Sequence, residues 1–239
     1  SEMCIRDRVK AAFPLTLESE QIYYEIPCAA IARPTRPETP TEKAKWEVPA
    51  LQWADLSDVE QNYGVSLLND SKYGYDGQLS QLRLTLLRSA EWPDPQADKG
   101  LHQFTYGIYP HIGNWQTAKT VQRGYELNRP LRIFSPGANI NLSKNSHQIS
   151  LPPVHEFLKI SADNLCIMAL KQAEFSPENW ILRVYEWAGK VAELEFKNNL
   201  NLAIAEKVDL LERTTDSGTE IHPWKIASFH LIIEKGDRS

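Results

Sequence analysis

The chain has 239 residues, of which 42% are hydrophobic, 10% aromatic and 24% charged, and its formal net charge is −5. This balance is typical of a globular protein and excludes an intrinsically disordered chain. The 31 acidic and 26 basic side chains are interspersed, without the basic stripe that neutralises nucleic-acid phosphates, and no run approaches the roughly 18 apolar residues of a membrane span. We therefore expect neither nucleic acid nor a membrane as a partner.

The cysteine and histidine patterns argue against two further kinds of site. Three cysteines lie far apart, a sparse and odd set that favours a reducing, cytoplasmic setting over a disulfide framework. The six histidines include no HxH, HxxxH or HExxH pair. His102 and His111 bracket one expected strand and lie an odd number of residues apart, so they should point to opposite faces. We expect no metal site in this chain.

The first eight residues, SEMCIRDR, lack the apolar core of a secretion signal. They resemble the translation of a transposon-end adaptor used for sequencing libraries. We interpret residues 1–8 as non-native sequence and Val9 as the first genuine residue. A disordered native terminus is the alternative.

Prolines dominate the segment that follows the first apolar runs. Pro27, Pro34, Pro37 and Pro40 crowd residues 26–49, which argues against a helix there and favours an extended edge segment or a connector. Short runs of β type come next, and the alternation of apolar and other side chains is clearest from Leu82 to Leu87. We predict strands at residues 46–53, 63–68, 79–87 and 103–109.

The period changes once, between residues 115 and 127, where apolar and polar positions recur at spacings of three and four without a proline. This pattern predicts one short amphipathic helix. Ala188-Gly189 has the turn chemistry of a tight hairpin between two runs, with the glycine supplying a positive φ. We predict further strands at residues 131–134, 148–151, 165–171, 180–187, 190–196, 207–211 and 224–234.

Many short strands with hardly any helix indicate an all-β fold built as an antiparallel β-sandwich. We expect a main sandwich over residues 9–160. Residues 161–239 are expected either to complete that sandwich or to form a small second β domain.

The densest polar and aromatic cluster lies between two apolar strands, from Leu68 to Gly77. Asp70 is suited to accept hydrogen bonds from sugar hydroxyls, and Tyr73 and Tyr75 are suited to stack on a sugar face. Lys72 is suited to orient a carboxylate of a neighbouring domain. The competing interpretation is that Asn69, Asp70 and Gly74 merely build a turn.

Other candidate residues are weaker. Asp70, Asp76, Glu91 and Asp94 supply enough carboxylates for a glycosidase pair, which needs a separation of roughly 5 to 9.5 Å, but spacing in sequence does not set that distance. We do not expect a complete catalytic pair. The seven tryptophans are spread singly through the runs, which favours packing over sugar platforms.

The chain resembles the carboxy-terminal region of glycoside hydrolase family 38 α-mannosidases of the cytosolic and bacterial type. The resemblance rests on short motifs in a fixed order that cover roughly residues 13–234. In the first half these are EIP at 25–27, RPT at 33–35, WADLS at 53–57, YGV at 63–65, LLND at 67–70 and KYG at 72–74. They continue with LTLLRS at 84–89, PDP at 93–95, ADKG at 97–100, HQFTY at 102–106, YPH at 109–111, LRVYE at 182–186 and DLLER at 209–213.

The resemblance implies a fold and an activity for the whole enzyme. The fold is a galactose-mutarotase-like supersandwich with one short helix, together with the small C-terminal sandwich considered above. Family members cleave terminal α-linked mannose with retention, using an aspartate nucleophile, a second acid and a bound divalent metal, usually zinc. Because those residues belong to an amino-terminal barrel and a helical middle domain, we expect this chain to be a non-catalytic fragment with no cofactor of its own.

The resemblance also implies site residues and partners. In such an enzyme the sandwich lends loops to the active-site rim, which points to Asp70, Lys72, Tyr73 and, as the best single candidate, Arg88. The expected partners are the barrel and middle domain of the same enzyme and mannose-containing glycans, and an uncovered interdomain face would favour self-association into a homo-oligomer. The alternatives are a stand-alone carbohydrate-binding sandwich and a purely structural module. For Arg88 the alternative is a surface salt bridge.

Overall fold

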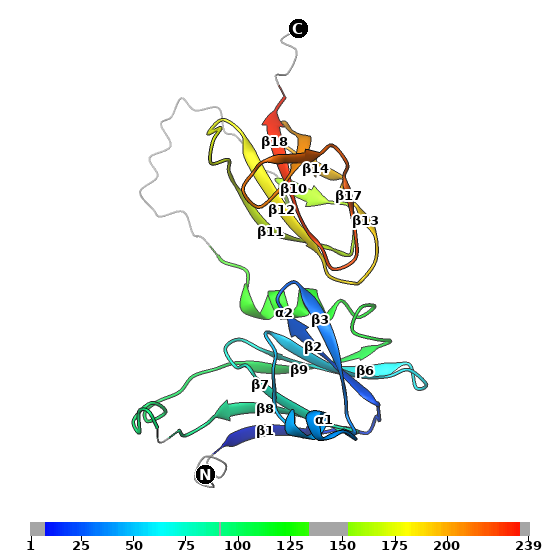
Figure 1. Cartoon of the computed structure of the whole chain (residues 1–239), viewed down its shortest axis with the longest axis vertical. Coiled ribbons are helices and arrows are strands. Elements are labelled where there is room, and N and C mark those ends of the chain that lie inside the picture. The colour runs from blue at the N-terminus through cyan, green and yellow to red at the C-terminus, as the bar shows by residue number, and fades with distance from the viewer. Residues whose placement is uncertain (1–7, 91, 134–152, 235–239) are drawn as a thin grey trace. The chain divides into compact units, whose positions relative to one another are not determined.

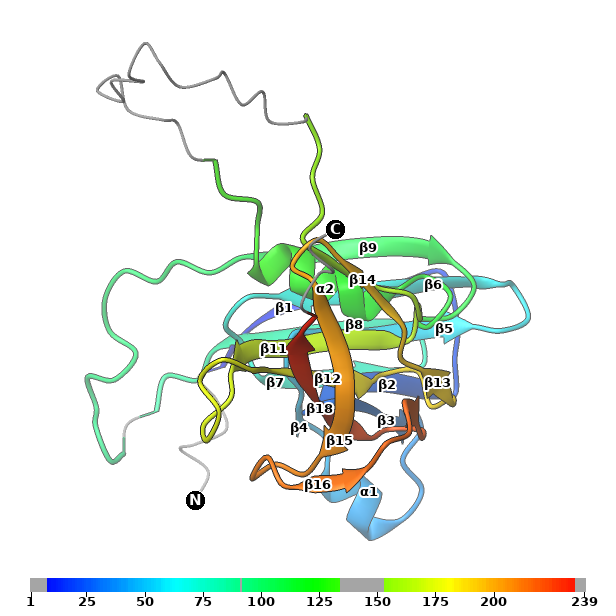
Figure 2. The ribbon, with the colours of Figure 1, turned by 90° about the horizontal axis from the view of Figure 1, so that it is seen from above.

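The computed structural model describes residues 8–90, 92–133 and 153–234, and its ribbon is drawn in Figures 1 and 2. The chain divides into two compact units, Ser1–Leu131 (unit 1) and Arg132–Ser239 (unit 2). Both units consist mainly of short antiparallel strands, so the predicted all-β fold is confirmed. The assignment of residues 1–8 as non-native and the boundary placed near residue 160 stay predictions.

Unit 1 contains two antiparallel sheets. The five-stranded sheet has the order β3-β2-β5-β6-β9, with β2 Gln21–Ile26, β3 Ala29–Pro34, β5 Trp53–Asp58, β6 Tyr63–Asn69 and β9 Tyr106–Ile112. The four-stranded sheet has the order β1-β8-β7-β4, with β1 Val9–Pro14, β4 Val48–Pro49, β7 Gly74–Gln78 and β8 Gln81–Leu87.

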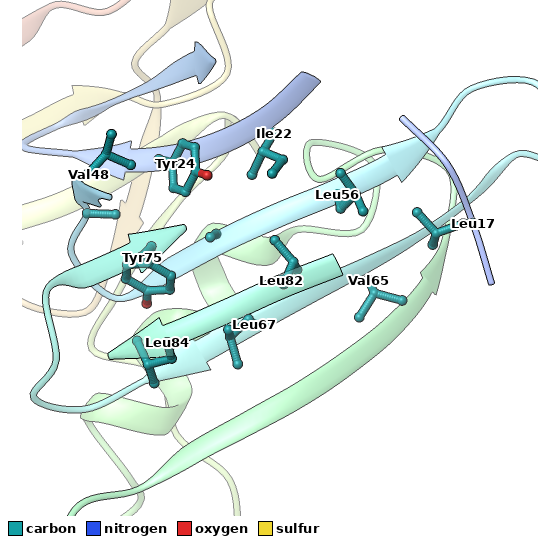
Figure 3. Packing of buried hydrophobic residues seen from close by; sticks show 12 residues of the cluster. Leu17, Ile22, Tyr24, Val48, Leu56, Val65, Leu67, Tyr75, Leu82 and Leu84 are labelled. Atoms are coloured by element: carbon teal, nitrogen blue, oxygen red, sulfur yellow. The ribbon is translucent and has the colours of Figure 1, made fainter. Parts of the chain in front are cut away.

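The core of unit 1 is a layer of apolar side chains that both sheets contribute (Figure 3). Ile22 and Leu56 come from the five-stranded sheet, Leu82 and Leu84 come from the four-stranded sheet, and each is at most 1% exposed. Full burial of a leucine or isoleucine side chain stabilises a fold by roughly 1.5 to 3 kcal/mol. The alternation read from residues 82–87 therefore identified a strand with one core face correctly.

Helix α2, Thr120–Asn128, covers the other face of the five-stranded sheet (Figure 2). Trp115, just before the helix, stacks on Trp53 of β5 with ring centroids 5.1 Å apart. A Cβ added at Gly124 would lie 3.3 Å from Cδ1 of Trp53, so the glycine lets the helix backbone approach the sheet closely. The helix predicted at 115–127 exists, but it begins at Thr120 because residues 115–119 form turns.

A second helix contradicts the prediction of extended structure throughout residues 26–49. Helix α1, Pro40–Ala44, follows Thr39, whose hydroxyl accepts a hydrogen bond from the Glu42 N–H while the Glu42 carboxylate accepts one from the Thr39 N–H. Such a capping box satisfies N–H groups that have no intrahelical partner. Pro40 fits because it occupies the first turn, where no N–H is required. The expectation of an edge segment is met by β3.

Unit 2 is built on the five-stranded antiparallel sheet β11-β12-β18-β15-β16. Its strands are β11 Leu165–Gln172, β12 Trp180–Glu186, β15 Leu202–Val208, β16 Thr214–Asp216 and β18 Ile226–Ile233. Two small strand pairs accompany it, β10 Leu158–Ile160 with β14 Phe196–Asn198, and β13 Ala192–Glu193 with β17 Glu220–Ile221. Side chains of the large sheet, among them Leu182 and Phe229, pack with Leu194 and Ile221 into one core.

Several strand predictions are wrong in whole or in part. Residues 131–133 form no regular structure, and the strand expected at 207–211 ends with β15 at Val208. The expected strands at 46–53 and 190–196 are interrupted, because only the short strands β4 and β13 and the first residues of β5 and β14 lie within them. Ala188-Gly189 is not a hairpin, because β12 pairs with β11 and β18 whereas β13 pairs with β17. Gly189 nevertheless has the expected positive φ, 73°. The predicted strand 148–151 lies outside the described residues.

Candidate functional site

The predicted functional loop begins at Asn69, the last residue of β6, and runs to Tyr73 just before β7. Asn69 is 1% exposed, and its Oδ1 accepts hydrogen bonds from the N–H groups of Ser71 (2.9 Å) and Lys72 (2.5 Å). Its Nδ2 donates to the Leu51 carbonyl at 3.0 Å and contacts the Tyr75 hydroxyl. A buried amide therefore fixes the backbone of the loop.

Asp70 joins this loop to the segment that precedes β9. Its Oδ2 accepts a hydrogen bond from the Thr105 N–H at 2.9 Å, and its own N–H donates to the Thr105 carbonyl at 3.1 Å. The Ser71 hydroxyl donates to Asp70 Oδ1 at 2.8 Å. Burial works against ionisation of Asp70, but the hydrogen bonds from Thr105 and Ser71 outweigh it and keep the pKa below its ordinary value.

Lys72 and Tyr73 are presented by this fixed backbone. The Lys72 ammonium lies 4.6 Å from the centroid of the Phe104 ring, and Tyr73 is 63% exposed. A cavity of about 150 Å³ adjoins them, lined by Leu51, Gln52, residues 69–73 and Asn128. Asn128 closes it from the end of α2, where its Nδ2 donates to the carbonyls of Asn69 and Gly124, both at 2.9 Å.

Arg88 follows β8 directly and is exposed. Strands β7 and β8 are antiparallel with Tyr75 opposite Leu84, so β8 ends at the end of the sheet where β7 begins. Asp98 Oδ2 accepts hydrogen bonds from the N–H groups of Arg88 (3.2 Å) and Ser89 (2.7 Å) and so fixes the backbone. Within the described residues no hydrogen bond or ion pair connects Arg88 to Asp70, Lys72 or Tyr73.

Comparison with known families accounts for both units. Residues 4–96 match the glycosyl hydrolases family 38 C-terminal domain, and residues 164–229 match the glycosyl hydrolases family 38 C-terminal beta sandwich domain. The chain belongs to glycosyl hydrolase family 38 and corresponds to the carboxy-terminal domains of its members. The predicted resemblance is confirmed.

Similar proteins are much longer than this family 38 chain. Alpha-mannosidase 2C1 of Homo sapiens is 37% identical over 95% of the chain, which spans 22% of that relative. Alpha-mannosidase G of Dictyostelium discoideum is 31% identical, and the chain spans 20% of its length. The crystal structure of an alpha-mannosidase from Enterococcus faecalis V583 shares the fold, with a TM-score of 0.76, 18% identity and coverage of 93% of this chain and 25% of that one.

The family 38 chain also contains a buried polar network that the sequence did not reveal. Asp55 is fully buried on the α2 face of β5, and its Oδ2 lies 2.7 Å from His111 Nε2. The hydroxyl of Ser57 donates to Asp55 Oδ1 at 2.5 Å, and that of Ser66 donates to Oδ2 at 2.7 Å. The Ser66 hydroxyl also lies 2.8 Å from Thr120 Oγ1, so the network reaches the first turn of α2.

This network resembles a catalytic triad in composition but not in geometry. Both serines bind the carboxylate, and neither is within hydrogen-bonding distance of the imidazole, so no hydroxyl is activated as a nucleophile. Gly64 leaves space for the imidazole of His111, because a Cβ added at Gly64 would lie 2.4 Å from His111 Cε1. His102, expected to bracket the same strand, lies before β9 in an exposed loop, so the opposite-face prediction does not apply.

The remaining carboxylates do not form a catalytic pair among the described residues. Asp76 is buried and pairs with Lys10 and Arg83, and Asp94 accepts the Gln96 N–H at 2.8 Å in a turn. Glu91 lies outside the described residues. Within the same described ranges, no cluster of three or more His, Cys, Asp or Glu side chains is arranged to hold a metal ion. No helix of the described part is long and apolar enough to span a membrane.

Two buried glutamates were also missed. Glu25 of β2 is 7% exposed, and burial raises its pKa to about 7 although the Gln52 N–H donates to its Oε2 at 2.6 Å. Glu186 of β12 is fully buried and accepts four hydrogen bonds from N–H groups. Each sits in an ordinary strand motif of the sequence. Two of the donors to Glu186, from Asn164 and Trp224, lie 22 and 38 residues away, so the sequence around Glu186 does not reveal the whole set.

Proposed function

We propose that the chain forms the non-catalytic carboxy-terminal β-sandwich part of a retaining, metal-dependent α-mannosidase, in which it supports the catalytic part and contributes to the active-site rim. The family match supports this assignment, as does the fact that the relatives named alpha-mannosidases are about five times longer than the stretch they share with this chain. Its partners would be the barrel and middle domain of the same cytoplasmic enzyme and mannose-containing glycans.

The anchoring of the Asn69–Tyr73 loop carries the rim proposal. Its backbone is held by Asn69, by the pair of hydrogen bonds between Asp70 and Thr105, and by Asn128 of α2. A loop that only connects two strands does not need three separate anchors, whereas a loop that presents side chains to a substrate must be rigid. Lys72 and Tyr73 are the side chains that this anchoring leaves available.

The chemistry of these side chains suits the edge of a sugar pocket. A tyrosine ring offers an apolar face to the C–H groups of a sugar, and an ammonium group donates hydrogen bonds to hydroxyls or carboxylates. The guanidinium of Arg88 presents a planar fork of donors that suits two neighbouring hydroxyls. The role of Asp70 is to shape the loop, because its carboxylate already accepts hydrogen bonds from Thr105 and Ser71.

The divalent metal of such an enzyme, usually zinc, has no counterpart in the residues described for this chain. The described side chains do not fit that group, and its ligands are proposed to lie in the catalytic part of the longer enzyme. Its proposed contribution is binding and orientation at the rim.

The test compares the 239-residue chain with a longer α-mannosidase polypeptide that contains it. We expect the chain alone to leave an aryl α-mannoside intact even with added zinc or cobalt. In the longer enzyme, Tyr73→Ala should lower kcat/KM by about 10-fold or more, or about 1.4 kcal/mol. Tyr63→Ala is the matched control, since Tyr63 is a 36% exposed tyrosine at the opposite end of β6.

Two results would refute the proposal. One is turnover by the chain alone that disappears when one of its own carboxylates is replaced. The other is a Tyr73→Ala enzyme with the same kcat/KM as the Tyr63→Ala control, which would assign the loop to folding only.

A further inference from the structure

The hydrogen bonds of residues 50–52, just before β5, connect β2 to the Asn69–Tyr73 loop. The pairing of β2 with β5 ends one residue before Glu25. Beyond that point the Leu51 N–H donates to the Glu25 carbonyl at 3.2 Å, and the Gln52 N–H donates to Glu25 Oε2 at 2.6 Å. Glu25 therefore holds the 50–52 segment through both its main chain and its side chain.

The loop holds the same segment from the other side. The Asn69 N–H donates to the Gln52 carbonyl at 2.9 Å, and Asn69 Nδ2 donates to the Leu51 carbonyl at 3.0 Å. The Ala50 N–H donates to the carbonyl of Tyr73 at 3.0 Å. The first and the last residue of the loop are therefore bonded to one short segment, so a movement of that segment displaces both ends of the loop.

The carboxylate of Glu25 lies on the face of the five-stranded sheet that α2 covers, because its neighbour Tyr24 points into the core on the other face (Figure 3). Glu25 is 7% exposed and has no cationic partner among the described residues, and burial raises its pKa to about 7. An ionised carboxylate buried in this way is unfavourable unless water or further donors reach it. Opening of the 50–52 segment would admit water to the carboxylate and relieve this cost.

The other titratable and charged groups of this region do not pair with Glu25. Cys28, in the turn after β2, and Tyr75 of β7 sense its charge, but burial raises their pKa values above the ordinary 9.0 and 10.0, so both are neutral below pH 8. The pKa of Asp70 lies below its ordinary value, so Asp70 is already ionised at pH 5. The charged side chains of α2 and its caps, and the buried pair on the same face of the sheet, are Lys119, Arg123, Glu126, Arg129, Asp55 and His111. Among the described residues none of them forms an ion pair with Glu25.

We infer that the charge of Glu25 controls how tightly the Asn69–Tyr73 loop is held: with Glu25 neutral the 50–52 segment stays closed, and with Glu25 ionised it opens more often. A group whose pKa is raised in the closed form stabilises that form fully below the pKa of the open form, and this contribution is lost as the pH rises through the higher pKa. The transition therefore runs from about pH 4.5 to about pH 7. Its importance for catalysis rests on the rim proposal, whereas its effect on the loop does not.

The test measures hydrogen exchange in the 239-residue chain by NMR at pH 5 and pH 7.5, corrected for intrinsic rates. The amides of Asn69, Ser71 and Lys72 report on the loop, because the first bonds to Gln52 and the other two bond to Asn69 Oδ1. We expect their protection to fall by about 10-fold or more between the two pH values, since the difference between the two pKa values of Glu25 sets the size of the change. In Glu25→Gln, which keeps an acceptor for the Gln52 N–H, protection should not change with pH. Glu18→Gln, at an exposed position of the same unit, is the matched control and should behave like the parent chain.

Three results would overturn the inference. The first is protection of the three loop amides that does not change with pH in the parent chain. The second is a pH dependence that survives in Glu25→Gln, which would assign it to another group such as the Asp55–His111 pair. The third is an opening free energy of the loop amides equal to that of the β8 amides at both pH values, because unit 1 would then open as a whole. Failure of the rim proposal is read separately, from equal kcat/KM in Tyr73→Ala and Tyr63→Ala, and would leave these exchange results unchanged.

Discussion

In each unit the carboxylate of one glutamate is buried without a cationic partner among the described residues. The two carboxylates differ in the number of hydrogen bonds that they accept. Glu186 in unit 2 accepts hydrogen bonds from Asn164 Nδ2 (3.0 Å) and from the N–H groups of Ala188 (2.7 Å), Gly189 (2.8 Å) and Trp224 (3.0 Å). Glu25 in unit 1 accepts one from Gln52 at 2.6 Å, and burial raises its pKa to about 7. The number of donors, and not burial alone, decides whether a buried carboxylate is stabilised.

This difference indicates a structural role for Glu186, whereas the carboxylate of Glu25 is buried with few hydrogen-bond donors. The carboxylate of Glu186 connects three segments of unit 2 by accepting hydrogen bonds from their N–H groups. Apolar core side chains could not accept these hydrogen bonds. Buried polar atoms without a hydrogen-bond partner among the described residues occur in both units, for example Gln52 Oε1 in unit 1 and His230 Nε2 in unit 2. The residues proposed for the active-site rim lie in unit 1.

The largest expected effect comes from removing the carboxylate of Glu186. Glu186→Ala removes the carboxylate that accepts from four N–H donors, and we expect the free energy of unfolding of unit 2 to fall by about 3 kcal/mol or more. Hydrogen exchange of the β12 and β18 amides measures this value. Glu195→Gln, an exposed glutamate of the same unit, is the control. Unchanged protection in Glu186→Ala would show that water replaces the carboxylate.

The next effect tests whether unit 1 is the functional unit. In a longer α-mannosidase that contains this chain, Arg88→Ala should lower kcat/KM by about 10 to 1000-fold, a loss of about 1.4 to 4 kcal/mol, with partial rescue by Lys. A rigid strand positions Arg88, so its donors need no reorganisation as charge develops on the sugar. A lowered Tm with normal kcat/KM would instead assign Arg88 to packing or to a surface salt bridge.

Much of the fold could be predicted from the sequence, but little of the polar architecture could. Alternation and strand-length apolar runs located β6, β8, β12 and β18, because side-chain periodicity is a local property. The polar loop at Asn69 was also found locally. Its anchor Asn128 lies 59 residues away, and Asp55 and His111 are 56 residues apart, so only the folded chain brings these groups together. The extra helix was missed because a proline was read as a breaker where it starts a helix.

Glu25 gives the third prediction, a dependence of stability on pH. Its folded pKa of about 7 lies above the ordinary value of 4.5, so between these values the folded state binds more protons than the unfolded state. The free energy of unfolding of unit 1 should therefore fall as the pH rises from about 4.5 to about 7, by on the order of 1 to 3 kcal/mol from this group. Hydrogen exchange of unit 1 core amides at pH 5 and pH 7.5, corrected for intrinsic rates, measures the change.

Glu25→Gln removes the titrating group but keeps an acceptor for the Gln52 N–H. In this variant the corresponding part of the pH dependence should disappear, whereas Glu18→Gln, at an exposed position of the same unit, should leave it unchanged. If both variants keep the pH dependence of the parent chain, another group is responsible and the contrast with Glu186 is reduced to a difference in hydrogen-bond number.

The smallest expected effect concerns Asn128, which connects α2 to the loop. Its Nδ2 donates to the Asn69 carbonyl, so Asn128→Ala removes one anchor while leaving the Asn69 side chain in place. A single hydrogen bond contributes about 1 kcal/mol, and we expect faster hydrogen exchange at the Ser71 and Lys72 amides by up to about 5-fold, with little change in Tm. Asn69→Ala should have a larger effect at the same amides, because both donate to its Oδ1. Glu126→Ala is the control on the exposed side of α2, where the carboxylate of Glu126 forms an ion pair with Arg123. Exchange at these amides that responds to Asn69→Ala but not to Asn128→Ala would show that β6 alone fixes the loop and that α2 has no part in positioning it.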